Sequence, residues 1–482
     1  MNNTIKQLSK KTNAVVLIFS LAYFLIVLFS CKLPMFWDMS YITQISNIIY
    51  DSNFTVFYSD IIDNGSSPIY SVFQALIWTV FGRSLPVTHF TLFPFIIGIL
   101  YQFSLLVKRF LNVKYTIWAF LFLLIEPTLL TQTVIAGYDL IICFLFLLAI
   151  NGIFQHKKWF ILLPVIFIPL INIRGFSIVI SIFLIDLFFN KQNFNTLRLF
   201  LKNTAPYMAS LVFLLIWMCY HYYITGWFFQ SHLRGSLHQF VGIQGMVKNL
   251  FYNFWKMVDF GRIFMFIMIL ILSMKIKLKV NPLLIILIIS LIVHLIFFLP
   301  FAYPVSHRHF LHLYPIMILL FCSLITIVKV KWRRMVVLVL AVLFLISGNF
   351  WIYPERFGNG WDSSLKSLSF FEQKNQLDVF IKNHNISPTL VGTKWPMNFD
   401  DYDTKLDNTH FMLADIEQLP LKNFEYIVQS NISNNFTATE IKELNSEWIL
   451  EKQFSSWPVY IYLFKNPNKH NKYTNCNQIK KQ

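Results

Sequence analysis

The stretch that decides the fold is AVVLIFSLAYFLIVLFSC, which runs from Ala14 to Cys31 and carries no charged residue. An apolar run of this length can cross the hydrocarbon core of a bilayer as a helix. Lysines stand before it and no small-residue cleavage site follows it, so we predict a signal anchor with a cytoplasmic N-terminus. The lysines are Lys6, Lys10 and Lys11.

Similar apolar runs recur as far as Tyr353, and clusters of Lys and Arg separate them after every second crossing. Under the positive-inside rule, this spacing predicts about eleven membrane-spanning helices whose basic loops face the cytoplasm. The run 159–190 contains two prolines and an Asn-Ile-Arg-Gly interruption, and the parity of the loops favours two helices over one long tilted helix. The predicted spans are 14–31, 87–107, 115–133, 138–154, two within 159–190, 206–224, 258–274, 282–300, 310–328 and 337–353.

Composition supports an all-α multi-pass membrane protein. Of the 482 residues, 56% are hydrophobic and 13% are charged, which is too apolar for a soluble chain of this length. The formal net charge of +17 could suggest a nucleic-acid partner, but the basic residues lie in short loops between apolar runs. The charge therefore reports topology, and we expect no nucleic-acid partner.

Two segments differ from the apolar runs. Residues 32–86 are acidic and too polar to span, so we place them outside as the first outer loop. After Tyr353 the composition becomes that of a soluble protein, so we predict a transmembrane module at 1–353 and an extracytoplasmic domain at 354–482. Short apolar stretches predict a small α/β unit there. Its predicted strands are 389–393, 424–428 and 459–464, and its predicted helices are 367–382 and 438–445.

Acidic residues at the outer ends of the spans are candidates for function, because a carboxylate in or beside the bilayer is costly unless it is paired or hydrated. Asp38 follows the first span, and Asp139 opens the fourth. Each has a simpler explanation. Asp38 could be a solvated interfacial residue beside Trp37, and Asp139 could favour the positive end of its helix.

Basic residues also occur on the predicted outer side, where the positive-inside rule keeps them rare. They are Arg174, within the interrupted run, and the group His307, Arg308, His309 and His312 before a later span. An anionic ligand such as a lipid phosphate would explain them, and so would anionic lipid headgroups. Acids and arginines at one interface suit a transferase of phosphate-linked substrates, whereas a transporter would bury such charges near the midplane.

The order of several short motifs resembles the GT-C superfamily of polyprenyl-phosphate-dependent glycosyltransferases. This superfamily includes protein O-mannosyltransferases and the aminoarabinose transferases of lipid A. The family's first outer loop has an acid, then a Gly-x-Pro-Pro-Leu-Tyr-like stretch and an amphipathic helix ending in Phe-Gly. The matching segments here are Trp37-Asp38, DNGSSPIY at 63–70, SVFQALIWTVFG at 71–82, EPTLL at 126–130, Tyr138-Asp139, NIRG at 172–175, and HRHF at 307–310 leading to Pro315.

The resemblance covers about residues 14–353 and implies roles for individual residues. It implies that Asp38 is the general base, that Asp139 shapes the same pocket, and that Arg174 and Arg308 bind the phosphate of the donor. Other residues that it implies for substrate or phosphate binding are Asp60, Asp63, Tyr70, His307 and His309. One departure affects the first loop, where Asn64-Gly65-Ser66 replaces the basic residue that some relatives carry.

The resemblance implies an inverting glycosyltransferase of the plasma (inner) membrane that acts on an acceptor at the outer face. Its partners would be a lipid-linked sugar donor, a glycan, lipid or protein acceptor, and membrane lipids. No cofactor is assigned with certainty and no residue is assigned to a metal site, although the carboxylates could hold a divalent metal ion. The alternatives are a flippase or transporter of a lipid-linked saccharide and a non-catalytic membrane assembly protein, and a ligase or polymerase of lipid-linked glycans also remains open.

Overall fold

The computed structural model describes residues 2–58, 66–228, 239–274, 281–302, 305–353, 360–417, 419–432 and 435–469. The chain divides into two compact units, which we describe separately. The helical unit comprises Met1–Trp351 and Asp362–Leu365, and the sheet unit comprises Ile352–Trp361 and Lys366–Gln482. The predicted residues Asp60 and Asp63 lie outside the described residues.

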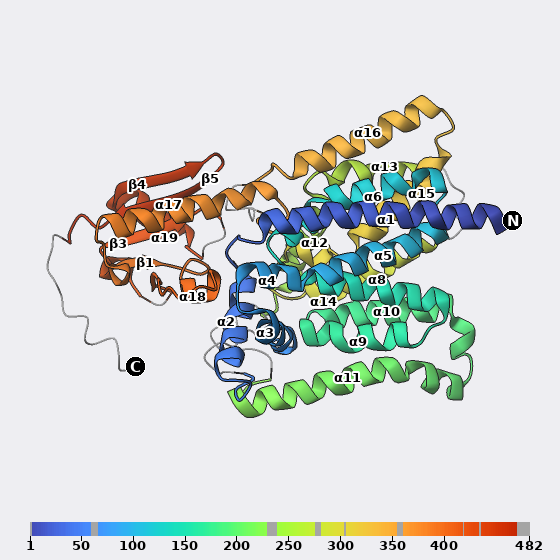
Figure 1. Cartoon of the computed structure of the whole chain (residues 1–482), viewed down its shortest axis with the longest axis horizontal. Coiled ribbons are helices and arrows are strands. Elements are labelled where there is room, and N and C mark those ends of the chain that lie inside the picture. The colour runs from blue at the N-terminus through green and yellow to red at the C-terminus, as the bar shows by residue number, and fades with distance from the viewer. Residues whose placement is uncertain are drawn as a thin grey trace. The chain divides into compact units, whose positions relative to one another are not determined.

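The helical unit is a bundle of apolar helices (Figure 1). In a helix the backbone N–H and C=O groups form hydrogen bonds within the segment, and apolar side chains cover them, as a bilayer requires. The helices are α1 (Asn2–Ser30), α2 (Asp38–Asp51), α3 (Ile69–Phe81), α4 (Leu85–Thr91), α5 (Phe93–Phe110), α6 (Thr116–Ile125), α7 (Pro127–Val134), α8 (Asp139–Gln155), α9 (Trp159–Ile171), α10 (Gly175–Phe189), α11 (Leu197–Thr225), α12 (Gly242–Val258), α13 (Arg262–Met274), α14 (Pro282–Phe298), α15 (Tyr314–Leu324) and α16 (Lys331–Gly348).

Membrane character is supported by the length and apolarity of these helices. Among the described residues, three are long and apolar enough to span a bilayer: Thr12–Ser30, Leu85–Phe110 and Leu197–Thr225. Two bent pairs raise that number to five when each pair is one span, with bends of 54° between α6 and α7 and 98° between α12 and α13. The other apolar helices are shorter. The total of about eleven spans therefore stays a prediction.

Interruptions in the apolar runs give the bundle its bends. The run 159–190 folds as two helices, α9 and α10, as the loop parity favoured. The break between α6 and α7 lies at Glu126-Pro127, where proline cannot continue the backbone hydrogen bonding of the preceding helix. Glu126 caps α7 by accepting a hydrogen bond from the backbone N–H of Leu129 at 2.6 Å.

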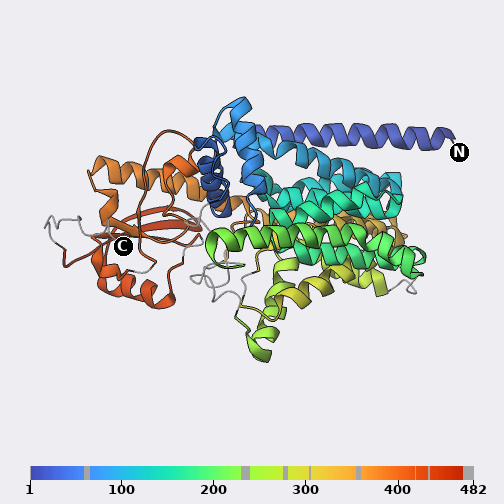
Figure 2. The same cartoon turned by 90° about the horizontal axis from the view of Figure 1, so that it is seen from below.

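One end of the bundle carries short helices that cross its long axis. Figure 1 shows α2 and α3 beyond the end of α1, and Figure 2 shows the same grouping from below. These two helices contact each other through Ile45, Ile49 and Ala75, and the hydroxyl of Ser71 donates to the carbonyl of Ile42. The segment 66–86 therefore returns to the bundle as structured helix rather than as an open loop.

The sheet unit contains a five-stranded sheet in the order β2-β1-β3-β5-β4. Strand β1 pairs in parallel with β2 and β3, whereas β3–β5 and β5–β4 are antiparallel. The predicted strands correspond to β1, β3 and β5, and the predicted helices to α17 and α19, but β2 and β4 were not predicted. The elements are α17 (Ser369–Asn383), β1 (Val391–Thr393), α18 (Asp401–Thr404), β2 (Ala414–Asp415), β3 (Tyr426–Ser430), α19 (Ala438–Glu447), β4 (Ile449–Ser456) and β5 (Val459–Lys465).

Candidate active site

Three of the predicted residues meet at one guanidinium in the helical unit. Asp38 begins α2, Asp139 begins α8, and Arg308 lies in the 3-10 turn His307–Phe310 before α15. Arg308 Nη2 donates to Asp38 Oδ2, and Arg308 Nη1 lies 3.7 Å from Asp139 Oδ2. Helices distant in sequence thus bring two carboxylates to the same cation.

The two carboxylates differ in their access to water. The side chain of Asp38 is 30% exposed, whereas that of Asp139 is 7% exposed and that of Arg308 is 10% exposed. Burial opposes the charge of Arg308, but Asp38 and Asp139 outweigh it and raise its pKa well above the ordinary value. Arg308 is therefore a permanent cation, and Asp38 is the carboxylate that a molecule arriving from water can reach.

The backbone beside both carboxylates is strained. Trp37, which precedes Asp38, has a φ of 53°, and Ala136, which lies three residues before Asp139, has a φ of 55°. A residue with a side chain rarely occupies this left-handed region unless surrounding contacts hold it there, and such strain gathers at functional sites. The buried side chain of Trp37 provides such a hold for the start of α2.

Arg174 lies in a polar cluster next to Asp139. Its Nε donates to Asn172 Oδ1 at 2.9 Å, and its Nη2 lies 3.4 Å from the hydroxyl of Tyr138. Asn172 Nδ2 donates to the same hydroxyl at 2.9 Å. The interruption between α9 and α10 therefore fixes Arg174 against the residue that precedes Asp139.

A pocket of about 390 Å³, including its open mouth, lies between these groups. Both arginines contribute to its lining, together with one carboxylate and several imidazole rings. Several polar groups converge on this pocket, as they do in sites that bind small ligands. The ionisable and imidazole side chains that line it are Asp139, Arg174, His294, Arg308, His309 and His312.

His309 contributes hydrogen bonding to the pocket rather than charge. Burial, followed by the nearby charges of Arg174 and Arg308, lowers its pKa well below the ordinary value. Its Nδ1 accepts a hydrogen bond from the backbone N–H of Ser306 at 3.2 Å. The neutral ring therefore carries its proton on Nε2.

Two other predicted residues have different surroundings. Tyr70 is buried on α3, with its ring centroid 6.4 Å from that of Tyr138. His307 is fully buried and contacts two carboxylates, Asp259 and Asp362, instead of lining the pocket. From sequence, Asp259 lies within the predicted span 258–274 and Asp362 within the predicted C-terminal domain, and neither residue is a predicted site residue.

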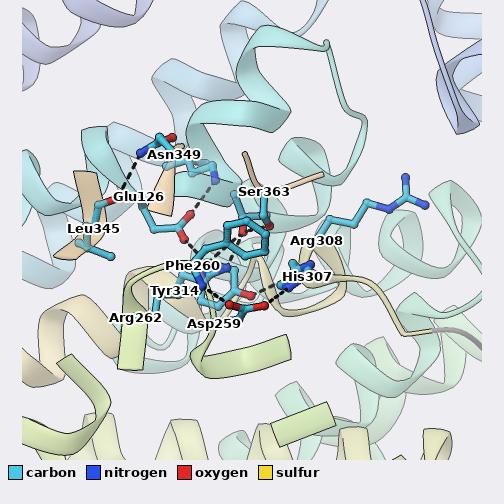
Figure 3. A network of polar contacts seen from close by, with 12 residues as sticks. Glu126, Asp259, Phe260, Arg262, His307, Arg308, Tyr314, Leu345, Asn349 and Ser363 are labelled. Carbon is cyan, nitrogen blue, oxygen red and sulfur yellow. Dashed lines mark hydrogen bonds and ion pairs between the residues drawn. The ribbon is translucent and has the colours of Figure 1, made fainter. Parts of the chain in front are cut away.

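A second buried network, drawn in Figure 3, was also missed. Arg262 Nη1 donates to Glu126 Oε1 at 3.1 Å, and Arg262 Nη2 donates to Thr128 Oγ1 at 2.9 Å. The hydroxyl of Thr128 lies 2.5 Å from that of Ser363. The available signal was a Glu within the predicted span 115–133 and an Arg within the predicted span 258–274, because membrane burial makes such residues costly unless they pair.

The described residues contain no group of three or more His, Cys, Asp or Glu side chains that could hold a metal ion. The carboxylates of the site instead contact arginine and histidine. The chemistry that this arrangement supports is proton acceptance by Asp38 beside two guanidinium groups that can hold an anion.

Comparison with known proteins identifies the fold. No protein-family model matches the chain, and no curated protein matches it. Two solved structures are similar to it over nearly its whole length. ArnT from Cupriavidus metallidurans bound to undecaprenyl phosphate has a TM-score of 0.54 and 9% identity, covering 93% of this chain and 97% of that chain. ArnT from the same organism in the apo state has a TM-score of 0.54 and 10% identity, covering 94% and 98%. This similarity shows that the chain shares the fold of ArnT, in agreement with the fold that the sequence resemblance implied.

Proposed function

We propose that this chain, which has the fold of ArnT, is a membrane glycosyltransferase that moves a sugar from a polyprenyl-phosphate donor to an acceptor. The observation that carries the proposal is the meeting of Asp38, Asp139 and Arg308 beside a pocket that also contains Arg174. The undecaprenyl phosphate bound to ArnT supports a lipid-linked donor. The acceptor would be a glycan, a lipid or a protein.

In the proposed reaction, Asp38 is the general base. It is the more exposed of the two carboxylates, and its ion pair with Arg308 holds it in place beside the pocket. Asp38 would remove the proton of the acceptor hydroxyl or amine as that group attacks the anomeric carbon of the donor sugar. A single displacement of this kind inverts the configuration at that carbon.

The leaving phosphate would be bound by arginine. Guanidinium groups bind phosphate with paired, charge-assisted hydrogen bonds, and they neutralise charge that develops as the phosphate departs. Arg174 and Arg308 both line the pocket, where Asn172 and His309 can add neutral hydrogen bonds. Asp139, which is almost fully buried, would orient Arg308 rather than exchange protons with the acceptor.

We propose that the site faces the non-cytoplasmic side of the membrane. Arg109 Nη2 donates to the carbonyl of Phe154 at 3.1 Å, and Asn190 Nδ2 donates to that of Ile153 at 3.3 Å, so the ends of α5, α8 and α10 meet. Basic residues gather at these ends, and the positive-inside rule assigns such an end to the cytoplasm. Asp139 begins α8, at the end opposite to Phe154, and Arg308 joins it to Asp38, which begins α2.

A transfer assay tests the proposal. The full-length protein in lipid nanodiscs would be supplied with radiolabelled polyprenyl-phosphate sugars and a membrane extract as the acceptor source. Replacing a general base removes a factor of about a hundred to ten thousand in rate, so Asp38→Asn should lose nearly all transfer. Asp51→Asn, at the exposed far end of α2, is the matched control and should retain wild-type activity.

The same preparation separates the proposal from its rivals. Wild-type transfer rates in Asp38→Asn would contradict the proposed role of Asp38. A wild-type protein that transfers no sugar but moves a lipid-linked saccharide across a vesicle membrane would be a flippase. If no donor is consumed and no lipid is moved, the assembly-protein alternative gains support.

A further inference from the structure

His307 is enclosed by two carboxylates, as Figure 3 shows for Asp259. Its Nε2 lies 3.1 Å from Asp259 Oδ2, and its Nδ1 lies 3.2 Å from Asp362 Oδ1. The three side chains are at most 2% exposed. A carboxylate oxygen lies within hydrogen-bonding distance of each ring nitrogen, so the ring is held from both sides.

Asp362 connects this ring to the backbone of Arg308. Its Oδ2 accepts a hydrogen bond from the Arg308 N–H at 3.0 Å, while its Oδ1 faces His307. Burial alone would raise the pKa of Asp362, but His307 and Arg308 outweigh it and hold the pKa well below the usual range. Asp362 is therefore ionised and can accept both hydrogen bonds at neutral pH.

The two carboxylates come from segments that other contacts hold rigidly. Asp259 lies in the turn between α12 and α13, and the ring centroid of the next residue, Phe260, lies 4.8 Å from that of His307. This turn approaches α16 so closely that a Cβ on Gly348 would lie 2.1 Å from the carbonyl oxygen of Phe260. Any larger residue at position 348 would therefore displace the turn, and Asp259 with it.

The segment that carries Asp362 is held in the same way. Ser363 contacts the hydroxyl of Thr128, and Gln132 Nε2 donates to the carbonyl of Asp362 at 3.3 Å. Ser364 donates to the carbonyl of Asn349 at 3.0 Å. All of these contacts lie within the helical unit. They hold Asp362 in place, and Asp362 in turn holds the backbone of Arg308.

We infer that the bridge Asp259–His307–Asp362 positions Arg308, and that His307 is a positioning residue acting through that arginine. The inference rests on the proposed function in one respect, namely that Arg308 binds the phosphate of the donor. Burying three ionisable groups is costly, and an apolar cluster of the same volume is often at least as stable, so stability alone does not account for the bridge. Fixed geometry does account for it, because displacing a reacting or binding group by about 1 Å can reduce a rate by about a hundredfold.

A labelling experiment tests the positioning without any ligand. Phenylglyoxal, which modifies arginine side chains, would be applied to the full-length protein in nanodiscs, and the modification of Arg308 measured by peptide mass spectrometry against exposed Arg109. Loosening Arg308 from Asp38 should increase its relative modification about fivefold or more in His307→Gln. His221→Gln, in which a buried histidine bonded to the carbonyl of Trp227 is replaced, is the matched control and should leave the ratio unchanged.

A binding cycle then tests whether His307 acts through Arg308. Undecaprenyl phosphate is the probe, titrated into wild type, His307→Gln, Arg308→Ala and the double variant. His307→Gln should weaken binding about tenfold in the wild-type background and leave binding unchanged in the Arg308→Ala background. Equal weakening in both backgrounds would assign His307 a general structural role and overturn the inference.

The outcomes separate this inference from the proposed function. If modification of Arg308 is the same in His307→Gln and wild type, the positioning inference is overturned whatever the lipid does. If modification rises but wild type does not bind undecaprenyl phosphate, the bridge stands and the proposed donor is wrong. Should His307→Gln not fold, the double variant Asp259→Asn/His307→Gln places neutral amides in the bridge, and the same modification ratio decides.

Discussion

Loss of the cation in the buried pair Glu126–Arg262 should destabilise the helical unit strongly. The two side chains are 1% and 0% exposed, and Arg262 Nη1 lies 3.1 Å from Glu126 Oε1. Arg262 also donates to Thr128 Oγ1, and its guanidinium lies 4.1 Å from the ring centroid of Tyr314. Arg262→Met keeps an unbranched side chain there but leaves the carboxylate of Glu126 buried without its counter-ion.

The expected cost follows from these contacts. Removing one partner of a buried ion pair typically costs about 3–5 kcal/mol, and the lost contact with the aromatic ring adds about 0.5–2 kcal/mol. A loss of about 4 kcal/mol lowers the ratio of folded to unfolded protein roughly a thousandfold. Unfolding of the full-length protein in mixed micelles of dodecyl maltoside and sodium dodecyl sulfate, followed by circular dichroism, would measure the change in free energy.

Two further variants calibrate this result. Arg109→Met removes an exposed arginine that also donates to a carbonyl and contacts an aromatic ring, and it should cost about 1 kcal/mol or less. The double variant Glu126→Gln/Arg262→Met leaves no charge within this pair and should recover more than half of the loss. The reasoning is refuted if Arg262→Met costs no more than Arg109→Met, or if the double variant is less stable than Arg262→Met.

Two more predictions concern a close backbone approach and the sheet unit. Gly261→Ala should destabilise the helical unit by several kcal/mol, because φ is +82° and the added Cβ would lie 1.9 Å from the carbonyl oxygen of Phe344. Gly226 is the control, since it has a similar φ of +81° but open space around it. Gly226→Ala should lower the free energy of unfolding by only about 1–2 kcal/mol in the same micelle titration. Burial would raise the pKa of Glu440, but hydrogen bonds from Lys394 and Thr437 outweigh it and lower that pKa below 4.5. Its carboxylate therefore adds stability above pH 4.5, and this stability is lost as the pH falls. At pH 7, Glu440→Gln should reduce the hydrogen-exchange protection of β1 and β3 by about 1 kcal/mol. The difference between the variant and wild type should shrink in acid, because the wild-type carboxylate is then protonated. An undiminished difference in acid would exclude the ionised carboxylate as its cause.

The sequence alone predicted most helices of the bundle because hydropathy is a local property. A run such as Ala14–Cys31 can satisfy its backbone only as a helix in an apolar environment, wherever its neighbours lie. The same locality explains the missed strand β4, whose first five residues are all exposed. An exposed edge strand has no alternating buried face, so its sequence carries little pattern.

The candidate residues Asp38, Asp139, Arg174 and Arg308 were also identified from sequence, because charges at the ends of apolar runs are costly and therefore informative. The resemblance also implied that they share one pocket, but not which side chains contact one another. Arg308 pairs with Asp38 across 270 residues, and hydropathy contains no information about which helix ends become neighbours. Only packing of the whole bundle decides that contact.

Asp259, His307 and Asp362 show this division most clearly. Composition assigned Asp362 to the soluble C-terminal segment, and tertiary structure places it in the helical unit against a histidine 55 residues earlier in the chain. A carboxylate in a polar stretch has no local sign of burial, because its cost appears only when surrounding helices exclude water from it. The sequence thus determined which groups were available, and tertiary packing determined which of them became a buried, mutually compensating set.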